Sequence, residues 1–329
     1  MKDIGIDLGT SNILIYEKDE GIILDEPSVI AIDNETKEVL AVGEEANKML
    51  GRTPNRVRAI RPLKDGVIAD FEYTNKMLET FIKKIKKRSS LKKSKILICC
   101  PTNITQVEKN AIYELAENIG AKKVYVEEEA KVAALGIGLN IEEPSGFMIV
   151  DIGGGTTDIA VLSLSSLVES TSIKVAGHTF DKAIIDYIKQ KHDLLIGEKT
   201  AEEIKIKLAS LIRIDNDNTM EIKGRSITNG MPKTIKIYQE EIKEALTSQV
   251  NIIIEEIKKV LENTQPELSS DIVEKGIIIT GGGALIDGIA QYIEEEVKIP
   301  IFIAEEPLKS VAQGCGIMLN NPKYLDYNC

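Results

Sequence analysis

The chain contains one short sequence pattern twice, and this repeat restricts its fold more than any other feature. Residues 3–16 read DIGIDLGTSNILIY, and residues 148–163 read MIVDIGGGTTDIAVLS. In each copy an apolar run ends in an aspartate, Asp7 or Asp151, and a glycine turn and a second apolar run follow. Two apolar runs around a tight turn predict a β-hairpin. We therefore expect two related hairpins in two related domains.

The glycine turns have the composition of phosphate-binding turns. Glycine permits positive φ and lets several backbone N–H groups point to one place, which suits a phosphate. The aspartate that ends the incoming strand can reach the same place and hold a hydrated magnesium ion. A third glycine run, residues 281–283, joins an apolar run to an expected helix, whose N-terminus would add free N–H groups. Each cluster alone is a weak signal, whereas the three together indicate nucleotide binding.

Composition excludes several other classes of protein. At 329 residues with 43% hydrophobic content, the chain is long enough for two domains with apolar cores. The net charge of -11 argues against non-specific nucleic-acid binding, so we expect no nucleic-acid partner. The four cysteines have no metal-ligand or disulfide spacing, which favours a reducing cytoplasm. No apolar stretch approaches the roughly 20 residues of a membrane span.

The order of expected elements predicts an α/β fold, because strands are followed by alternating helices and strands. Two capping boxes, Thr105 with Glu108 and Thr200 with Glu203, mark expected helix starts. Apolar runs predict strands near residues 4–8, 12–16, 22–24, 28–32, 95–100, 124–128 and 276–280. Helical spacing predicts helices near residues 73–87, 106–120, 130–138, 180–192, 202–210, 238–263 and 284–296.

In this order the three glycine clusters resemble those of the actin and Hsp70 superfamily of ATPases. Longer segments resemble the MreB family of bacterial actins in particular, almost from end to end. They are EPSVIAID (26–33), IRPLKDGVIADF (60–71), VYVEEEAKVAALG (124–136), PSGFMIVDIGGGTTDIAV (144–161), GEKTAEEIKIK (197–207), IIITGGGALIDG (277–288) and EEPLKSVAQGCG (305–316).

The resemblance implies an actin-like ATPase fold, with two related domains, each of a mixed sheet and helices, and four subdomains around a nucleotide cleft. Domain I would span residues 1–143, with subdomain IB at about 32–64, and the segment at about 313–329 would return to it. Domain II would span residues 144–312, with subdomain IIB at about 179–244.

The resemblance also implies the site residues and the cofactors, ATP or ADP with Mg2+. Asp7 and Asp151 match the carboxylates that hold magnesium, largely through water. Glu202 and Lys205, which alone would read as an exposed helical pair, match ribose- and base-side contacts. The residues that match ATP-binding positions are Gly9, Thr10, Ser11, Asn12, Gly153, Gly154, Gly155, Thr156, Gly177, Glu202, Lys205, Gly281, Gly282, Gly283 and Ala284.

Three successive glutamates, residues 127–129, compete for the catalytic position. Counting back from the small-residue helix that follows them in the family selects Glu129, with Glu128 as the alternative. Thr156 matches the residue that helps to orient the attacking water. Hydrolysis requires a water lined up behind the γ-phosphate, and both residues would serve that alignment. Both assignments are what the resemblance implies.

The chain departs from the family pattern around Glu129. Ala130 replaces the family's proline, Glu127 replaces an apolar residue, and Lys131 replaces the usual methionine. Loss of the proline frees the backbone next to Glu129, so we expect altered, slower ATP turnover. His178 stands where the family often has aspartate, and we expect it to make a loop contact rather than to act in catalysis.

A densely basic segment, KKIKKRSSLKKSK at residues 83–95, interrupts the acidic chain. It reads either as a solvated helix end and loop or as a contact with an anionic membrane surface. The family's membrane loop carries an apolar pair, of which Leu91 remains while Lys92 replaces its partner. We therefore expect Leu91, Lys92 and Lys93 to bind lipid by charge more than by insertion.

The resemblance carries the functional prediction: an ATPase that polymerises into membrane-associated protofilaments, paired antiparallel. Such filaments work with membrane-embedded cell-wall elongation proteins to determine cell shape. The protein would be cytoplasmic and peripheral to the inner face of the cell membrane. The alternatives are a chaperone-type ATPase, a small-metabolite kinase, and an assembly adaptor that binds nucleotide without polymerising.

Overall fold

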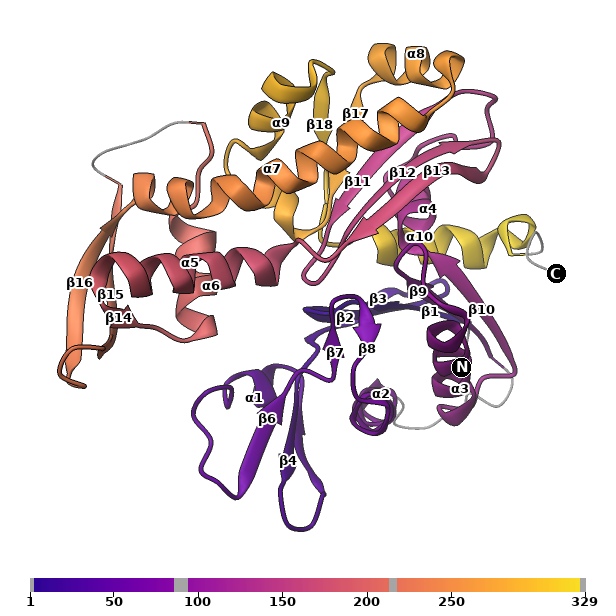
Figure 1. Cartoon of the computed structure of the whole chain (residues 1–329). Helices are drawn as coiled ribbons and strands as arrows, with labels where there is room; N and C mark the ends of the chain where they lie inside the picture. Colours follow the sequence, from indigo (N-terminus) through magenta and orange to yellow (C-terminus); the bar gives the residue numbers. More distant parts are fainter. Residues whose placement is uncertain (1–2, 86–93, 213–217, 326–329) are drawn as a thin grey trace.

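The computed structural model describes residues 3–85, 94–212 and 218–325 of the chain. Its elements form two sheet-containing halves, one from the N-terminal part of the chain (indigo to purple in Figure 1) and one from the middle (magenta to orange). Each half contains a five-stranded sheet and a smaller three-stranded sheet. None of the helices in these described ranges is long and apolar enough to cross a membrane.

The two large sheets have the same strand order. The first runs β3-β2-β1-β9-β10, and the second runs β13-β12-β11-β17-β18. In each, the first three strands are antiparallel neighbours and the last two join in parallel. The strands of the first sheet are β1 (Ile4–Leu8), β2 (Asn12–Glu17), β3 (Gly21–Pro27), β9 (Lys95–Cys100) and β10 (Lys123–Glu128). Those of the second are β11 (Phe147–Ile152), β12 (Thr157–Ser163), β13 (Ser166–Ile173), β17 (Ile277–Thr280) and β18 (Ile301–Ile303).

The sequence repeat is therefore a repeat of structure. Asp7 is the next-to-last residue of β1, and Asp151 is the next-to-last residue of β11. Each glycine turn connects the central strand of its sheet to the next antiparallel strand, as the two hairpins predicted.

Two smaller sheets lie away from the large ones (Figure 1). The first contains β4 (Ile30–Asp33), β5 (Val39–Val42) and β6 (Val57–Ile60), with α1 (Glu44–Asn47) beside it. The second contains β14 (Leu194–Leu195), β15 (Thr219–Ser226) and β16 (Pro232–Tyr238). A short hairpin of β7 (Leu63–Lys64) and β8 (Val67–Ile68) leads back from the first of them. The domain and subdomain boundaries given above stay a prediction.

Helices cover both large sheets. In the first half they are α2 (Phe71–Ile85) and α3 (Gln106–Asn118); in the second they are α7 (Gln239–Asn263), α8 (Pro266–Lys275) and α9 (Ile289–Val297). Helices α5 (Gly177–His192) and α6 (Glu198–Leu208) contact the small sheet of the second half. The long helix predicted near residues 238–263 is confirmed as α7. It forms because Ile242, Leu246, Val250, Ile253 and Ile257 recur every three or four residues, and all five are buried.

A shared core joins the two halves. It is built around α4 (Glu129–Gly136) and α10 (Ser310–Asn320), together with residues of both sheets such as Leu97 and Ile149. The two helices cross closely at Gly314, which has no side chain. A β-carbon there would lie 2.7 Å from the carbonyl carbon of Val132. This tight crossing places the start of α4 at a defined position between the sheets. A short 3₁₀ helix, η2 (Pro322–Tyr324), follows α10.

Two local predictions were wrong. Helix α6 starts after Gly197 without a side-chain cap, so Thr200 lies inside its first turn and forms no capping box there. The third glycine run does not open an α-helix either. Gly282 and Gly283 instead begin a 3₁₀ turn, η1 (Gly282–Leu285), and Gly288 in the left-handed region precedes α9. Gly288 redirects the backbone, so the chain completes a tight turn before it becomes α-helical.

Candidate nucleotide site

The two glycine turns meet each other across the halves of the molecule. A β-carbon at Gly154 would lie 2.8 Å from Cβ of Ser11, and one at Gly155 would lie 2.5 Å from Oγ1 of Thr10. The Thr10 hydroxyl also accepts a hydrogen bond from the backbone N–H of Gly66, 3.0 Å away. The backbone of the second turn therefore packs directly on side chains of the first, and the β7–β8 turn closes over both.

The glycines serve close approach rather than unusual backbone angles, contrary to the expectation from sequence. None of Gly9, Gly153, Gly154 and Gly155 has positive φ, and within the three glycine runs only Gly281 does, at 79°. At Gly9 a β-carbon would lie 2.5 Å from the carbonyl oxygen of Asn12. A side chain would therefore collide with the turn itself or with its partner turn.

Carboxylates from both halves converge beside these turns. Burial, with a smaller contribution from Asp25, raises the pKa of Asp7 to about 7. Burial, followed by the charges of Asp158 and Asp7, raises the pKa of Asp151 to about 8. Burial also raises the pKa of Glu129 well above its usual value, with contributions from Asp158, Asp7 and Asp151. Because these groups disfavour one another's charge, a bound cation would stabilise their ionised forms.

The donor set fits a hydrated magnesium ion better than a directly ligated metal. Carboxylate oxygens are the ligands that Mg2+ prefers, and it usually keeps several waters. Within the described ranges, no group of three or more His, Cys, Asp or Glu side chains has the geometry to hold a metal directly. The carboxylates of Asp7 and Asp151 would suit an ion that keeps its waters, and their role as magnesium ligands stays a prediction.

Asp158 is a site residue that the sequence reasoning missed. It lies opposite Asp151 in the β11–β12 register and is only 1% exposed. Its Oδ1 accepts a hydrogen bond from the backbone N–H of Thr102 in the first half, 2.7 Å away. Burial raises its pKa, while hydrogen bonds from Thr102, Ser172 and Thr156 partly offset that rise. The sequence did carry one sign of it: Asp158 is a single charged residue next to an apolar run, seven residues after Asp151. The structure shows that the whole of β12 is buried.

The three glutamates at residues 127–129 lie in different surroundings. Glu129 is the first residue of α4, and its pKa responds to the carboxylates at the glycine turns. Glu128 faces a separate pocket, described below. Glu127 is buried and forms an ion pair with Lys131, with 3.1 Å between Oε2 and Nζ. Glu129 is therefore the glutamate beside the turns, and its catalytic role stays a prediction.

His178 links the two turns. Its Nε2 lies 3.1 Å from Oγ of Ser11, and its backbone N–H donates to the carbonyl of Gly154 at 2.8 Å. Burial, followed by the charges of Arg61 and Lys205, lowers the pKa of His178 to about 4, so the ring is neutral near pH 7. The contact agrees with the expected loop role. Arg61, which the sequence reasoning did not select, adds positive charge beside the turns.

The residues predicted on the adenosine side also gather at the second turn. Lys205 Nζ lies 2.8 Å from Oδ1 of Asp181 and donates to the carbonyl of Gly177 at 3.1 Å. The N–H of Gly177 in turn donates to the carbonyl of Gly153. Glu202, one turn before Lys205 on α6, is half-buried and contributes to the raised pKa of Asp181.

The third glycine run packs on the end of β11. A β-carbon at Gly281 would lie 2.6 Å from the carbonyl carbon of Ile152, and one at Gly283 would lie 2.7 Å from its Cβ. Ala284 is buried behind them, whereas Gly282 is exposed. Asn12 is the first residue of β2, and its side chain donates to Asp25 at 2.7 Å. The structure therefore brings Gly281 and Gly283 to the end of β11 that carries Asp151.

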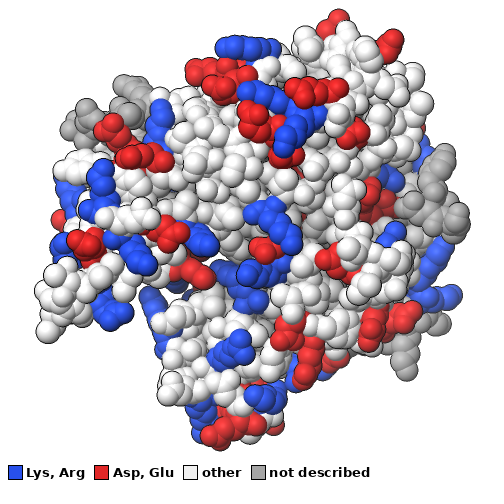
Figure 2. Space-filling model, viewed as in Figure 1, with Lys and Arg blue, Asp and Glu red and all other residues white. Residues whose placement is uncertain are grey.

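The surface is hollowed between the two small sheets. Figure 2 shows a recess between the surface over β14–β16 and the surface over β4–β6, with Lys and Arg side chains along its walls and some Asp and Glu side chains among them. Positive charge around a recess attracts polyphosphates.

The predicted lipid-contacting residues Leu91, Lys92 and Lys93 lie outside the described residues.

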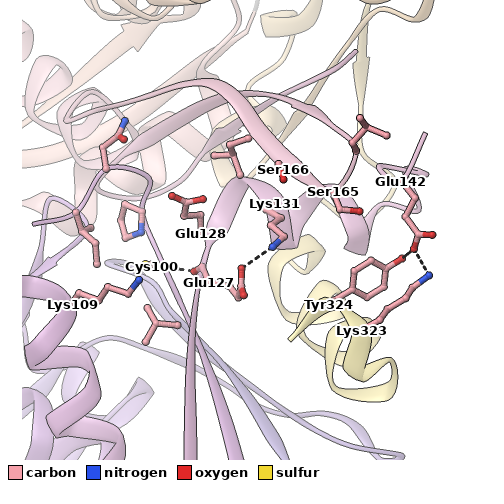
Figure 3. Close-up of a pocket in the computed structure, with 16 residues that line it drawn as sticks. Cys100, Lys109, Glu127, Glu128, Lys131, Glu142, Ser165, Ser166, Lys323 and Tyr324 are labelled. Carbon is pink, nitrogen blue, oxygen red and sulfur yellow. Dashed lines mark hydrogen bonds and ion pairs between the residues drawn. The ribbon is translucent and has the colours of Figure 1, made fainter. Parts of the chain in front are cut away.

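A separate cavity of about 880 Å³ lies beside β10 and α4 (Figure 3). Residues of both halves line it, including Lys109, Glu128, Lys131 and Leu164, and none of the predicted nucleotide-binding residues is among its lining. At one end Glu142 pairs with Lys323 and accepts a hydrogen bond from Tyr324. This cavity lacks the glycine turns, so its lining does not have the phosphate-binding features that the sequence predicts.

Comparison with known proteins agrees with this architecture. A model of the MreB/Mbl protein family matches residues 1–327. The cell shape-determining protein Mbl of Bacillus cereus is 57% identical over 320 residues, which cover 97% of this chain and 96% of that protein. The crystal structure of MreB 5 of Spiroplasma citri bound to AMPPNP matches with a TM-score of 0.94 and 42% identity, covering 97% of this chain and 96% of that one. The ADP-bound structure of the same protein matches with a TM-score of 0.93 and 42% identity, covering 99% and 98%. The predicted actin-like α/β fold is confirmed, and the chain belongs to the MreB/Mbl family.

Proposed function

We propose that this protein is a bacterial actin that binds and hydrolyses ATP and polymerises into membrane-associated filaments that direct cell-wall synthesis and cell shape. One observation carries the nucleotide part: the duplicated glycine turns meet, with Asp7, Asp151 and Glu129 converging beside them. The similarity to the AMPPNP- and ADP-bound MreB 5 structures supports the same ligands here.

The two turns would hold the phosphates through backbone N–H groups, with Lys205 near the ribose and the Gly281–Gly283 run beside the base. Asp7 and Asp151 would hold Mg2+ through water, and the ion would neutralise phosphate charge and stabilise the ionised carboxylates around it. Glu129, at the start of α4, would orient the attacking water, with Thr156 beside it. In a buried site each of these interactions would be electrostatically stronger than in bulk solvent.

Filament formation follows from family membership rather than from the site. A head-to-tail contact needs two different complementary surfaces, which one chain does not reveal. The cell shape-determining role in the name of the relative Mbl supports a filament of copies of this chain. We propose that its protofilaments pair antiparallel. We propose that it works beside membrane-embedded cell-wall elongation proteins, at the cytoplasmic face of the cell membrane.

The basic segment at residues 83–95 is the proposed lipid contact. Each Lys or Arg near an anionic surface contributes on the order of 1 kcal/mol, and a filament presents many copies at once. Binding to phosphatidylglycerol-containing liposomes should therefore be lost in high salt or in a Lys92→Glu, Lys93→Glu variant. Cosedimentation unchanged by both treatments would remove this part of the proposal.

Pelleting, electron microscopy and phosphate release, measured with ATP, ADP or no nucleotide in the presence of Mg2+, test the whole proposal. We expect filaments with ATP and slow phosphate release. ATP binding with only monomers, across lipid conditions, would favour the assembly adaptor. Transfer of phosphate to a small metabolite would favour the kinase.

A further inference from the structure

An ion pair spans the junction between strand β10 and helix α4. Glu127 is the fifth residue of β10, Lys131 is the third residue of α4, and Glu129 lies midway between them. The Glu127 and Lys131 side chains are 4% and 9% exposed, and the Oε2–Nζ distance is 3.1 Å. Figure 3 shows the two side chains pointing toward each other in the wall of the 880 Å³ cavity. The pair therefore connects the two elements that meet at Glu129.

Apart from the ion pair, the Cys100 thiol contacts the strand side of the junction, where it donates to the carbonyl oxygen of Glu127 at 3.5 Å. Glu128 is the residue before the helix, and its side chain makes no capping hydrogen bond. Ala130 is fully buried but carries only a methyl group. By contrast, the backbone of Glu127 is held in the sheet opposite Cys99. The ion pair thus fastens the first turn of α4 to a strand residue whose position the sheet has already set.

Stability alone does not explain such a pair. Removing two charges from water costs several kcal/mol per ion, and replacement by apolar residues of similar volume is often neutral or stabilising. A buried pair does impose one geometry, because each charge must face the other. Orientation matters at this junction, since a displacement of about 1 Å at a reacting centre can lower a rate about a hundredfold.

We propose that Glu127 and Lys131 act as a positioning pair that sets the orientation of Glu129 toward the attacking water. This inference rests on the proposed ATPase function and deepens it. The pair acts through the backbone at the start of α4 and does not touch the nucleotide. The two departures from the family pattern, read separately in the sequence, are partners in the structure.

The decisive variant replaces both members together, Glu127→Leu with Lys131→Met, so that no charge remains buried and unpaired. We expect a melting temperature close to that of the unaltered protein and an unchanged Kd for ATP. Single-turnover release of phosphate from bound ATP should fall about tenfold, because loss of alignment affects the transition state and not ground-state binding. The exchanged variant, Glu127→Lys with Lys131→Glu, keeps an ion pair and should recover most of the rate.

A control lies on α2, where exposed Glu72 and half-buried Lys76 form an ion pair with the same spacing. The Glu72→Leu, Lys76→Met variant should leave both Kd and turnover unchanged. The positioning role is wrong if the apolar pair at 127 and 131 hydrolyses bound ATP at the normal rate, or if its slower rate is matched by an equal loss in ATP affinity. Failure of the underlying function looks different: Glu129→Gln in the otherwise unaltered chain would then release phosphate normally.

Discussion

The two Asp–Gly hairpins have the same connections but different cross-strand partners. Asp7 on β1 lies opposite Leu14 on β2, whereas Asp151 on β11 lies opposite Asp158 on β12. The first hairpin therefore contributes one carboxylate and the second contributes two. One position in a duplicated hairpin is enough to add a polar network, because opposite residues in an antiparallel pair lie about 5 Å apart.

The two turns also differ in which of them carries side chains at the contact between the halves. The first turn carries the side chains of Thr10 and Ser11, and the second offers bare backbone at Gly154 and Gly155 where those side chains pack. The second hairpin also receives a hydrogen bond from the other half, from Thr102 to Asp158. We propose that both copies hold phosphate and metal, that Thr10 of the first copy serves ATP binding, and that the second copy also joins the halves beside Glu129, where Thr156 serves hydrolysis.

The largest expected effect comes from filling the space between the turns. Gly155→Ala should weaken ATP binding about tenfold to a hundredfold, because overpacking costs about 1–3 kcal/mol and the new methyl group would meet Thr10. The control is Gly153→Ala, whose β-carbon would meet only the carbonyl of Thr156, at 3.2 Å. Titration with a fluorescent ATP analogue measures both. Equal losses in the two variants would show that the turns do not meet as described.

A smaller effect should appear in the pH dependence of stability without nucleotide or Mg2+. The pKa of Asp151 rises from 3.8 to about 8 on folding, so between these values the folded chain holds a proton that the unfolded chain lacks. The free energy of unfolding therefore falls as pH rises through this window, by up to about 1.4 kcal/mol per pH unit for one such group. Asp158→Asn should reduce the slope, because the charge of Asp158 raises the pKa of Asp151.

Melting temperatures between pH 5 and 8 in EDTA test this expectation. Asp25→Asn is the matched variant for the first hairpin, where Asp25 raises the pKa of Asp7. A melting temperature that rises steadily with pH, or a slope identical in the unaltered protein and in both variants, would contradict the assignment of these carboxylates as the source.

The smallest expected effect concerns the bridge between the turns. His178→Ala removes the contact with Ser11, and a neutral hydrogen bond contributes about 1 kcal/mol, so nucleotide dissociation should accelerate about fivefold. Because the pKa of His178 is lowered to about 4, the effect should be constant between pH 6 and 8. Stopped-flow displacement of a fluorescent nucleotide measures it. An effect that vanished above pH 6.5 would mean that the charged ring makes the contact.

Local patterns predicted the fold well. The Asp–Gly repeat predicted two hairpins, and apolar spacing predicted α7, because both signals come from residues close in sequence. The missed features depend on distant residues. The Thr102–Asp158 hydrogen bond and the meeting of Gly155 with Thr10 join the two halves, so no local pattern contains them. The Glu127–Lys131 pair was visible only as two substitutions, since strand and helix spacing differ and only the junction geometry brings them together.

The division of labour between the hairpins is the central claim, and one matched pair of substitutions tests it most directly. Thr10→Val and Thr156→Val each remove one buried hydroxyl, one from each side of the site, with little change in side-chain volume. The measurement is the Kd for ATP together with the single-turnover rate of phosphate release from saturated protein. Thr10→Val should raise the Kd about fivefold and leave the rate unchanged, and Thr156→Val should leave the Kd unchanged and lower the rate about tenfold or more. A slower rate in Thr10→Val, or a change confined to the Kd in Thr156→Val, would contradict the account.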